Sequence, residues 1–294
     1  MPGIDTLIGL RKLSLSDYGI AKKRHNFSDN IIYNDLSLGR ERFSLIVVNN
    51  EDDAVLNPNH FLYTTRVIDS AGILKERDEE YYEGCSCEAS CSASNCSCHN
   101  VGYSKDGLLQ MDELMEVIYE CNAACECTLH CGNRVAQKGA TKPVQIFRTK
   151  SKGWGVKTMS WLPKGTFIGE YTGELHREGD GAGEYLFETK LGESSCTIDA
   201  KKCGNFTRFV NHSCEPNLHA ASVIWENCVN PYVHICFFTV RDIDAGEELT
   251  VDYGPEWWSE NIISFPCRCR SSNCSFNAAV RSEILAEREN TGEI

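Results

Sequence analysis

The sequence has no long hydrophobic run and no export signal at its start. Its longest apolar stretches, such as residues 233–238, fall far short of the roughly 20 residues that a membrane-spanning helix needs. Residues 1–5 contain no basic stretch that leads into an apolar core. We therefore expect neither secretion nor contact with a membrane. Internal repeats and low-complexity tracts are also absent.

Basic residues are fewer than acidic residues. The chain has 29 lysines and arginines against 42 aspartates and glutamates, a net charge of −13. Such a surface repels phosphates, so we expect no direct, sequence-specific nucleic-acid partner. It can attract a basic peptide and speed the encounter with it. The alternative is an acidic surface that only keeps the protein soluble, and the composition leaves this open.

The Cys-x2-Cys spacing of common zinc fingers is missing, although the chain has 17 cysteines. Their odd number, their clustering and the lack of an export signal favour metal ligands over the alternative, a disulfide framework. Nine thiols in two blocks cannot give three separate zinc ions four ligands each, but they can if three sulfurs each bridge two ions. The Cys-x-Cys spacing suits such sharing because neighbouring ligands can reach adjacent ions. The nine are Cys85, Cys87, Cys91, Cys96, Cys98, Cys121, Cys125, Cys127 and Cys131.

A cluster of this kind would be structural and would contribute to the free energy of folding. Three zinc ions with nine thiolates carry a charge of −3, which basic side chains or backbone N–H groups must compensate. A zinc hydrolase is disfavoured because no His/Glu ligand motif is present. A third group, Cys267, Cys269 and Cys274, provides three of the four ligands of another site, and Cys214 is the best candidate for the fourth.

The chain changes character after Pro143. Short β-type runs alternate with glycine-containing turns, which predicts a mostly β domain, and no βαβ alternation appears. A helix is expected around residues 278–288. We divide the chain into an N-terminal extension (1–42), N-terminal strands with the first cysteine module (43–141), a catalytic domain (142–254), a second cysteine module (255–281) and a tail (282–294). The predicted strands lie at 43–48, 61–65, 144–147, 166–171, 185–187, 196–198, 234–240 and 249–251.

Four stretches of the second half resemble, in content and order, the SET-domain lysine methyltransferases. They are residues 152–156 (Lys-Gly-Trp-Gly-Val), 169–174 (Gly-Glu-Tyr-Thr-Gly-Glu), 208–217 (Arg-Phe-Val-Asn-His-Ser-Cys-Glu-Pro-Asn) and 247–254 (Glu-Glu-Leu-Thr-Val-Asp-Tyr-Gly). The nine-cysteine array is similar to a pre-SET module, and the last three cysteines are similar to a post-SET module. Together they resemble the Su(var)3-9 class, fungal members included, over roughly residues 43–276.

The resemblance implies a SET-domain fold of small curved sheets with a threaded carboxyl-terminal segment. It also implies a pre-SET cluster of three zinc ions, a single post-SET zinc ion and S-adenosylmethionine as the methyl donor. The implied substrate is the tail of histone H3, most often at lysine 9, in nuclear chromatin, with a role in heterochromatin and gene silencing. No chromatin-targeting segment is recognised, so we expect separate targeting proteins as partners. The alternatives are a catalytically silent chromatin-binding module and a methyltransferase of a non-histone protein.

The reaction defines what the site must do. The attacking lysine must be a neutral amine, whereas free lysine has a pKa of about 10.4. A narrow aromatic channel desolvates the amine and aligns it with the methyl group. The resemblance makes Tyr253 and Tyr185 the catalytic residues of this channel, and Arg208 is either a cofactor neighbour or a structural ion-pair partner. The residues implied to bind the cofactor are Lys152, Gly153, Trp154, Tyr185, Arg208, Asn211, His212 and Arg268.

One position departs from the class. Two residues before Tyr253 the class usually has an aromatic residue, and here there is Val251. In the family a hydroxyl at this position limits methyl addition, so an apolar side chain predicts accessible di- and trimethyl products, although a looser channel could slow turnover. The peptide is expected to add as a β-strand, with Asp199 and Glu170 as candidates to read its basic side chains. The two residues fit a solvated surface equally well.

Overall fold

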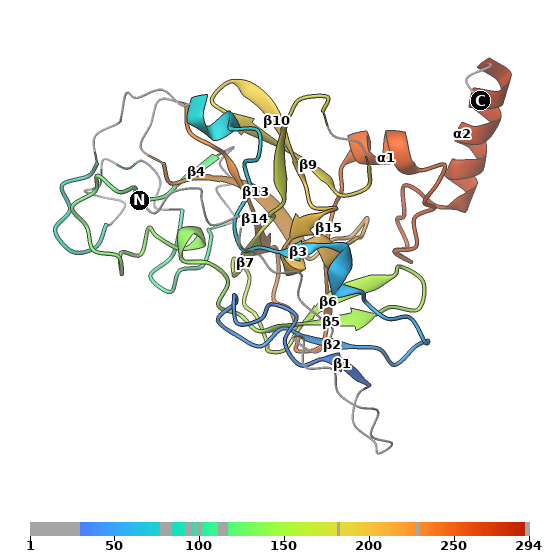
Figure 1. Ribbon diagram of the computed structural model, residues 1–294, viewed down its shortest axis with the longest axis horizontal. Coiled ribbons are helices and arrows are strands. Elements are labelled where there is room, and N and C mark those ends of the chain that lie inside the picture. The colour runs from blue at the N-terminus through green and yellow to red at the C-terminus, as the bar shows by residue number, and fades with distance from the viewer. Residues whose placement is uncertain are drawn as a thin grey trace.

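The computed structural model describes residues 30–76, 84–91, 96, 98, 102–110, 117–180, 183–226 and 230–291. Most of the predicted N-terminal extension and residues 292–294 lie outside these ranges. The described residues form fifteen β-strands in four sheets and two α-helices, which confirms the mostly β prediction (Figure 1). None of the described helices has the length and apolar character needed to cross a membrane.

The largest sheet has six strands in the order β1-β2-β5-β6-β15-β12. Its centre is the antiparallel hairpin β5-β6, and the parallel pairing of β12 with β15 sets Asn211 opposite Thr250 and His212 opposite Val251. This pairing brings the third motif stretch, residues 208–217, beside the strand that leads to Tyr253, as the resemblance implies. The strands are β1 (Ile31–Tyr33), β2 (Ile46–Val48), β5 (Val144–Arg148), β6 (Trp154–Thr158), β12 (Asn211–His212) and β15 (Glu248–Val251).

A four-stranded sheet in the order β4-β13-β14-β7 forms much of the remaining core. All six residues of β14 are buried between two neighbouring strands, which explains the apolar run at residues 235–238. The parallel pairing of β13 with β4 attaches the first cysteine module to the catalytic domain. The strands are β4 (Val117–Tyr119), β7 (Phe167–Glu170), β13 (Leu218–Ile224) and β14 (His234–Thr239).

Two smaller sheets complete the β structure. In the three-stranded sheet β8-β10-β9, alternate residues of β10 such as Cys196 and Ile198 are buried, so this sheet has one covered face. The other sheet pairs β3 with β11 in parallel and joins the N-terminal segment to the core. The strands are β3 (Leu62–Tyr63), β8 (Glu174–Arg177), β9 (Leu186–Leu191), β10 (Ser194–Asp199) and β11 (Cys203–Gly204).

Both α-helices follow the catalytic strands. Helix α1 (Pro255–Asn261) begins after Gly254, whose φ of 86° favours glycine, and proline occupies the first helical position, where its missing N–H costs nothing. Helix α2 (Ala278–Thr291) covers the predicted helix and projects away from the sheets (Figure 1). The Arg281 guanidinium ties it to the end of α1 through the carbonyl groups of Ile262 and Ile263.

Candidate active site

The predicted cofactor residues come together around one cavity of about 750 Å³. Its walls come from the loop before β6, from β12, from α1 and from the second cysteine module. The predicted Tyr253 also lines it. Two N-terminal residues that the motifs did not indicate, Asn57 and Phe61, line it as well. The predicted residues in its lining are Lys152, Gly153, Trp154, Tyr185, Arg208, Asn211, His212 and Arg268.

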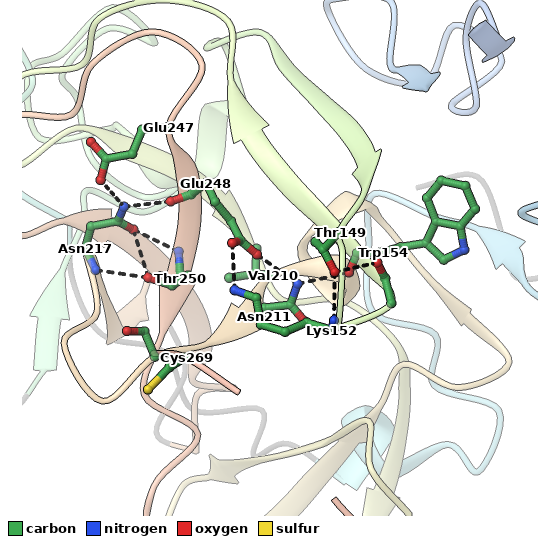
Figure 2. Close-up of polar contacts among 12 residues, drawn as sticks. Thr149, Lys152, Trp154, Val210, Asn211, Asn217, Glu247, Glu248, Thr250 and Cys269 are labelled. Carbon is green, nitrogen blue, oxygen red and sulfur yellow. Dashed lines mark hydrogen bonds and ion pairs between the residues drawn. The ribbon is translucent and has the colours of Figure 1, made fainter. Parts of the chain in front are cut away.

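Glu248 organises the polar side of this cavity. One carboxylate oxygen lies 2.6 Å from Lys152 Nζ, and the other accepts a hydrogen bond of 2.9 Å from Asn211 Nδ2 (Figure 2). Asn211 Nδ2 also donates to the Trp154 carbonyl at 3.1 Å. Both amide hydrogens of Asn211 are therefore used, and its carbonyl oxygen remains to accept a hydrogen bond from a ligand.

Glycine explains how β6 approaches this network. A Cβ on Gly155 would lie 3.0 Å from Asn211 Nδ2 and from a carboxylate oxygen of Glu248, so a larger residue would push both aside. Gly153 has a φ of 76° and no crowded Cβ direction, so backbone conformation rather than close approach calls for glycine there. Thr149 Oγ1 holds the turn by donating to the Gly153 carbonyl and accepting from the Lys152 N–H.

Asn217 makes a second connection between the motif stretches 208–217 and 247–254. Its side chain donates to the Glu248 carbonyl at 2.8 Å and to a carboxylate oxygen of Glu247 at 2.9 Å (Figure 2). Its carbonyl oxygen accepts from the Thr250 N–H at 2.8 Å. Asn217 is thus a structural residue that fixes β15 beside β12.

His212 is a neutral, buried ring at the base of the cavity. Burial lowers its pKa to about 4. Its Nδ1 accepts from the Tyr253 N–H at 3.2 Å, so the proton belongs on Nε2, which lies 3.3 Å from Cys214 Sγ. The ring packs edge-on against Trp258, which stacks on Phe276. These rings link the cavity to the second cysteine module.

A narrow cavity of about 50 Å³ adjoins the large one, and Tyr185 and Tyr253 line both. Val251 and Phe237 form part of its wall. Tyr253 donates its hydroxyl to the Val210 carbonyl at 2.9 Å, so the lone pairs of the phenol oxygen remain available. Burial raises the pKa of Tyr253 above its usual range, and the hydroxyl stays protonated at neutral pH.

Tyr171 is a third tyrosine of this passage that the sequence analysis missed. It lines the narrow cavity and donates its hydroxyl to the Tyr185 carbonyl at 2.8 Å. Its ring packs on Phe187 and Phe237. Tyr171 lies inside the motif stretch 169–174, so its position in that stretch was the available signal.

Two arginines fix the rim of the large cavity. Arg208 donates to the Ala200 carbonyl at 2.7 Å, and its guanidinium lies over the rings of Tyr185 and Phe61 at 4.4 and 4.5 Å. Among the described residues it has no carboxylate partner, which disfavours the ion-pair alternative. Arg268 donates to the Ser151 carbonyl at 2.6 Å and closes the second cysteine module onto the loop before β6.

The first cysteine module has an interior made of sulfur. Its nine cysteines form one cluster, and several sets of four sulfurs lie within 4.8 Å of one another. Cys85 belongs to three such sets, and Cys91, Cys96 and Cys121 each belong to two, so these sulfurs lie close enough to be shared between ions. The spacing therefore fits bridged zinc ions, while their number stays a prediction. The sets are Cys85, Cys91, Cys121 and Cys127; Cys85, Cys96, Cys98 and Cys121; and Cys85, Cys87, Cys91 and Cys96.

The cluster has the predicted charge compensation. Backbone N–H groups point at its sulfurs, as from Cys91 to Cys131 Sγ at 3.3 Å. The buried Arg134 guanidinium lies 3.7 Å from Cys127 Sγ, and the Asn133 amide lies 3.4 Å from Cys121 Sγ. These donors would stabilise thiolates around a metal ion.

The second cysteine module brings Cys214 to Cys267, Cys269 and Cys274, with all four sulfurs within 4.8 Å of one another. The sulfurs of Cys214 and Cys274 are 3.8 Å apart, about the separation of two thiolates on one tetrahedral zinc ion with bonds of roughly 2.3 Å. The fourth ligand predicted from the sequence therefore lies where the site needs it.

Glu170 forms an ion pair with His234. Its carboxylate is 2.7 Å from His234 Nδ1 and lines neither the large nor the narrow cavity. The ion pair gives Glu170 a structural role, and its contact with a basic peptide side chain stays a prediction. Asp199, at the end of β10, accepts from the Lys201 N–H.

Comparison with known proteins supports the same class. The SET domain profile matches residues 153–254, and the Pre-SET motif profile matches residues 37–134. Human histone-lysine N-methyltransferase EHMT1 is 36% identical over 274 residues, which are 89% of this chain and 21% of that protein. A Schizosaccharomyces pombe histone-lysine N-methyltransferase, H3 lysine-9 specific, is 33% identical over 264 residues, covering 78% of this chain and 54% of that protein.

Solved structures agree. The crystal structure of KRYPTONITE in complex with mCHH DNA, an H3(1-15) peptide and SAH has a TM-score of 0.73 at 28% identity, covering 86% of this chain and 55% of that chain. The chain thus spans from about a fifth to just over half of these relatives. The fold and the matches define a SET-domain protein with a Pre-SET motif. Within that class, the chain belongs to the Su(var)3-9 family, which confirms the resemblance.

Proposed function

We propose that this protein transfers methyl groups from S-adenosylmethionine to a lysine of the histone H3 tail, with lysine 9 as the target. The observation that carries the proposal is the meeting of a large cavity, with Lys152 and Asn211 on its polar side, with a narrow passage. The passage is walled by Tyr171, Tyr185 and Tyr253. Relatives named as H3 lysine-9 specific methyltransferases, and a neighbouring structure that contains SAH and an H3 peptide, support this substrate and this donor.

The residues of the cavity have separate tasks in this proposal. The donor would be bound by Lys152, Gly153, Trp154, Arg208, Asn211, His212 and Arg268. The Asn211 carbonyl oxygen would accept a hydrogen bond from the ammonium group of the donor. S-adenosylmethionine supplies the sulfonium methyl group when bound. Zinc in the second cysteine module would hold that module over the cavity and exclude water.

The narrow passage prepares the nucleophile. Its aromatic walls exclude water, which lowers the pKa of a lysine amine and favours the uncharged form. The hydroxyl oxygens of Tyr253 and Tyr171, held by the Val210 and Tyr185 carbonyl groups, can accept weak C–H···O contacts from a polarised methyl group. Val251, buried in the passage wall, leaves room for an amine that already carries methyl groups.

Mass spectrometry of an H3 tail peptide, incubated with the protein and S-adenosylmethionine, tests the proposal. We expect di- and trimethylation at lysine 9, and no product on a peptide with arginine at that position. Tyr253→Phe should slow transfer by on the order of 10²-fold, as the loss of one oriented polar group at a reacting centre does. Tyr119→Phe, at the exposed end of β4, is the matched control and should keep full activity.

The outcomes separate the alternatives. No methylation of any histone tail, with retained peptide binding, would indicate a silent chromatin-binding module. Methylation of other proteins in a peptide array, without the H3 tail, would indicate a non-histone substrate. Only monomethyl product at long times would refute the role of Val251. A role in heterochromatin and gene silencing in the nucleus, with separate targeting proteins, follows from the proposed substrate and is tested by H3 lysine-9 methylation in cells that lack the protein.

A further inference from the structure

A second large cavity, of about 610 Å³, lies apart from the proposed transfer site and shares none of its lining residues. It opens where three parts of the chain meet: the N-terminal segment around residues 40–42 and 65–67, the end of the first cysteine module at 136–140, and the ends of β7, β13 and β14. Ligand sites often form at such junctions between modules. Nothing in methyl transfer requires this cavity.

The floor of the cavity is a buried charged triad. His234 lies between two carboxylates, with Nδ1 2.7 Å from Glu170 and Nε2 2.8 Å from Glu226. The Trp225 ring stacks on the imidazole at 3.4 Å, and the Tyr232 ring packs edge-on against it. With both ring nitrogens facing carboxylates, the histidine is an imidazolium, which offsets one of the two glutamate charges.

The rim of the cavity is basic. Four cationic side chains from three separate segments line it: Arg40, Arg42, Arg66 and Lys138. Arg40 and Lys138 each make one contact with a backbone carbonyl, at 3.4 and 3.2 Å. Within the part of the chain that the structure describes, the guanidinium groups of Arg42 and Arg66 have no hydrogen-bond or ion-pair partner.

The balance of charge sets this cavity apart from the rest of the molecule. Its lining holds four basic residues and the imidazolium against three glutamates, Glu41, Glu170 and Glu226, in a chain whose net charge is −13. Glu41 is committed to a hydrogen bond of 2.7 Å from the Tyr63 hydroxyl. A cavity with unpaired guanidinium groups, and with more positive than negative side chains in its lining, is suited to an anion.

We propose that this cavity binds a phosphate group, presented by a small phosphate-bearing molecule or by a phosphorylated peptide side chain. Arg42 and Arg66 donate to its oxygens, and Arg40 and Lys138 add positive charge at the rim. A tetrahedral dianion suits this arrangement better than a carboxylate because it offers oxygens to donors that come from several directions. This inference goes beyond methyl transfer and does not depend on it.

Binding is tested with the intact chain by calorimetry and thermal unfolding, so that activity is not the readout. The probes are inorganic phosphate, potassium chloride at equal ionic strength, and a phosphoserine peptide beside its unphosphorylated twin. We expect phosphate and the phosphopeptide to bind and to raise the melting temperature, and chloride and the plain peptide to do neither. The stronger of the two phosphate probes identifies the source of the phosphate group.

Charge-neutral variants locate the site. Arg42→Gln and Arg66→Gln should each weaken phosphate binding roughly tenfold, as the loss of a hydrogen bond to a charged group does. Lys105→Gln removes one charge from an exposed turn elsewhere and should bind as the unaltered chain does. The melting temperature of each variant in chloride shows that it is folded. Equal stabilisation by phosphate and chloride, or equal binding by all three variants, would overturn the proposal.

Discussion

Cys121 and Ile146 are both fully buried, yet they lie in interiors of different kinds. Ile146, on β5, belongs to a cluster of aliphatic and aromatic side chains that spans the sheets. Cys121 belongs to a cluster whose buried members are all cysteines. Apolar burial stabilises the first interior in proportion to its area. The second has little apolar area to bury, so its order has to come from what the sulfurs bind.

The local structure of the two regions differs in the same way. Across residues 84–91 and 120–134, the described chain has no strand and is held by turns and by N–H groups that point at sulfur. The catalytic domain has backbone ladders of up to six strands. One chain thus combines a β core that folds by burying apolar side chains with cysteine modules that fold by binding metal. The proposed donor site lies where the β core meets the second cysteine module.

Removal of zinc should break this comparison most strongly. A strong zinc chelator is expected to unfold the first cysteine module and to release the second, because a structural zinc ion contributes on the order of 10 kcal/mol to folding. Methyl transfer should be abolished. Hydrogen exchange should show lost protection at 117–134 and retained protection in β5 and β14. Added zinc should restore both properties, and unchanged protection in the cysteine module would refute metal-dependent order.

Ile146→Ala tests the other side of the comparison. It leaves a cavity in the centre of β5 and should lower the free energy of unfolding by about 2–5 kcal/mol, measured by urea denaturation. Ile146→Val, the graded control, should cost about 1 kcal/mol. Zinc content, measured by atomic absorption, should not change in either variant. A loss of zinc in proportion to the loss of stability would show that the two interiors are not independent.

The sequence was most informative where the chemistry is local. The spacing of cysteines over residues 85–131 predicted a shared cluster, and runs such as 144–147 and 234–240 predicted β5 and β14, because ligand reach and β-propensity act over a few residues. The four motif stretches predicted that Asn211 and Tyr253 share a cavity. The roles of the site residues and the boundaries of the modules remain predictions.

Long-range pairing is what the sequence could not show. Strand β4 pairs with β13 across about a hundred residues, and β12 has only two residues, too few for any periodicity. The ion pair of Glu170 was not foreseen because its partner, His234, lies 64 positions away and has no local signal. The entry of Phe61 into the wall of the cavity depends on the pairing of β3 with β11, also far apart in the chain.

His234 shows that the β core also contains a buried charge, and the stability that this charge contributes should depend on pH. Burial by itself would lower its pKa, but hydrogen bonds to Glu170 and Glu226 raise it to about 9, above its ordinary value of 6.5. The neighbouring Tyr232 stays neutral because burial raises its pKa. The imidazolium therefore stabilises the fold fully below pH 6.5, and this contribution, on the order of 3 kcal/mol, is lost as the pH rises through 9.

Urea denaturation between pH 6.5 and 9.5 measures this loss. His234→Gln should be less stable than the unaltered chain at pH 6.5, and the difference between them should shrink as the pH rises. Other groups titrate in both proteins and cancel in the comparison. Parallel stability curves for the two proteins would mean that His234 is not protonated in the fold.

Glu120 joins the two interiors and should have the smallest effect of the four. Its buried carboxylate accepts hydrogen bonds from the Tyr103 hydroxyl and from the backbone N–H groups of Val135, Ala136 and Gln137, with a fifth from the Gln137 side chain. All five partners are donors. In Glu120→Gln, the new side-chain NH2 group therefore faces a donor where an oxygen accepted before. We expect a loss of about 1–3 kcal/mol in the free energy of unfolding, because that group is left without an acceptor.

Glu126→Gln, at an exposed position of the same module, is the control and should change stability little. If Glu120 couples the modules, its variant should also lose zinc at a lower chelator concentration than the control does. Equal chelator sensitivity with reduced stability would confine the role of Glu120 to the β core.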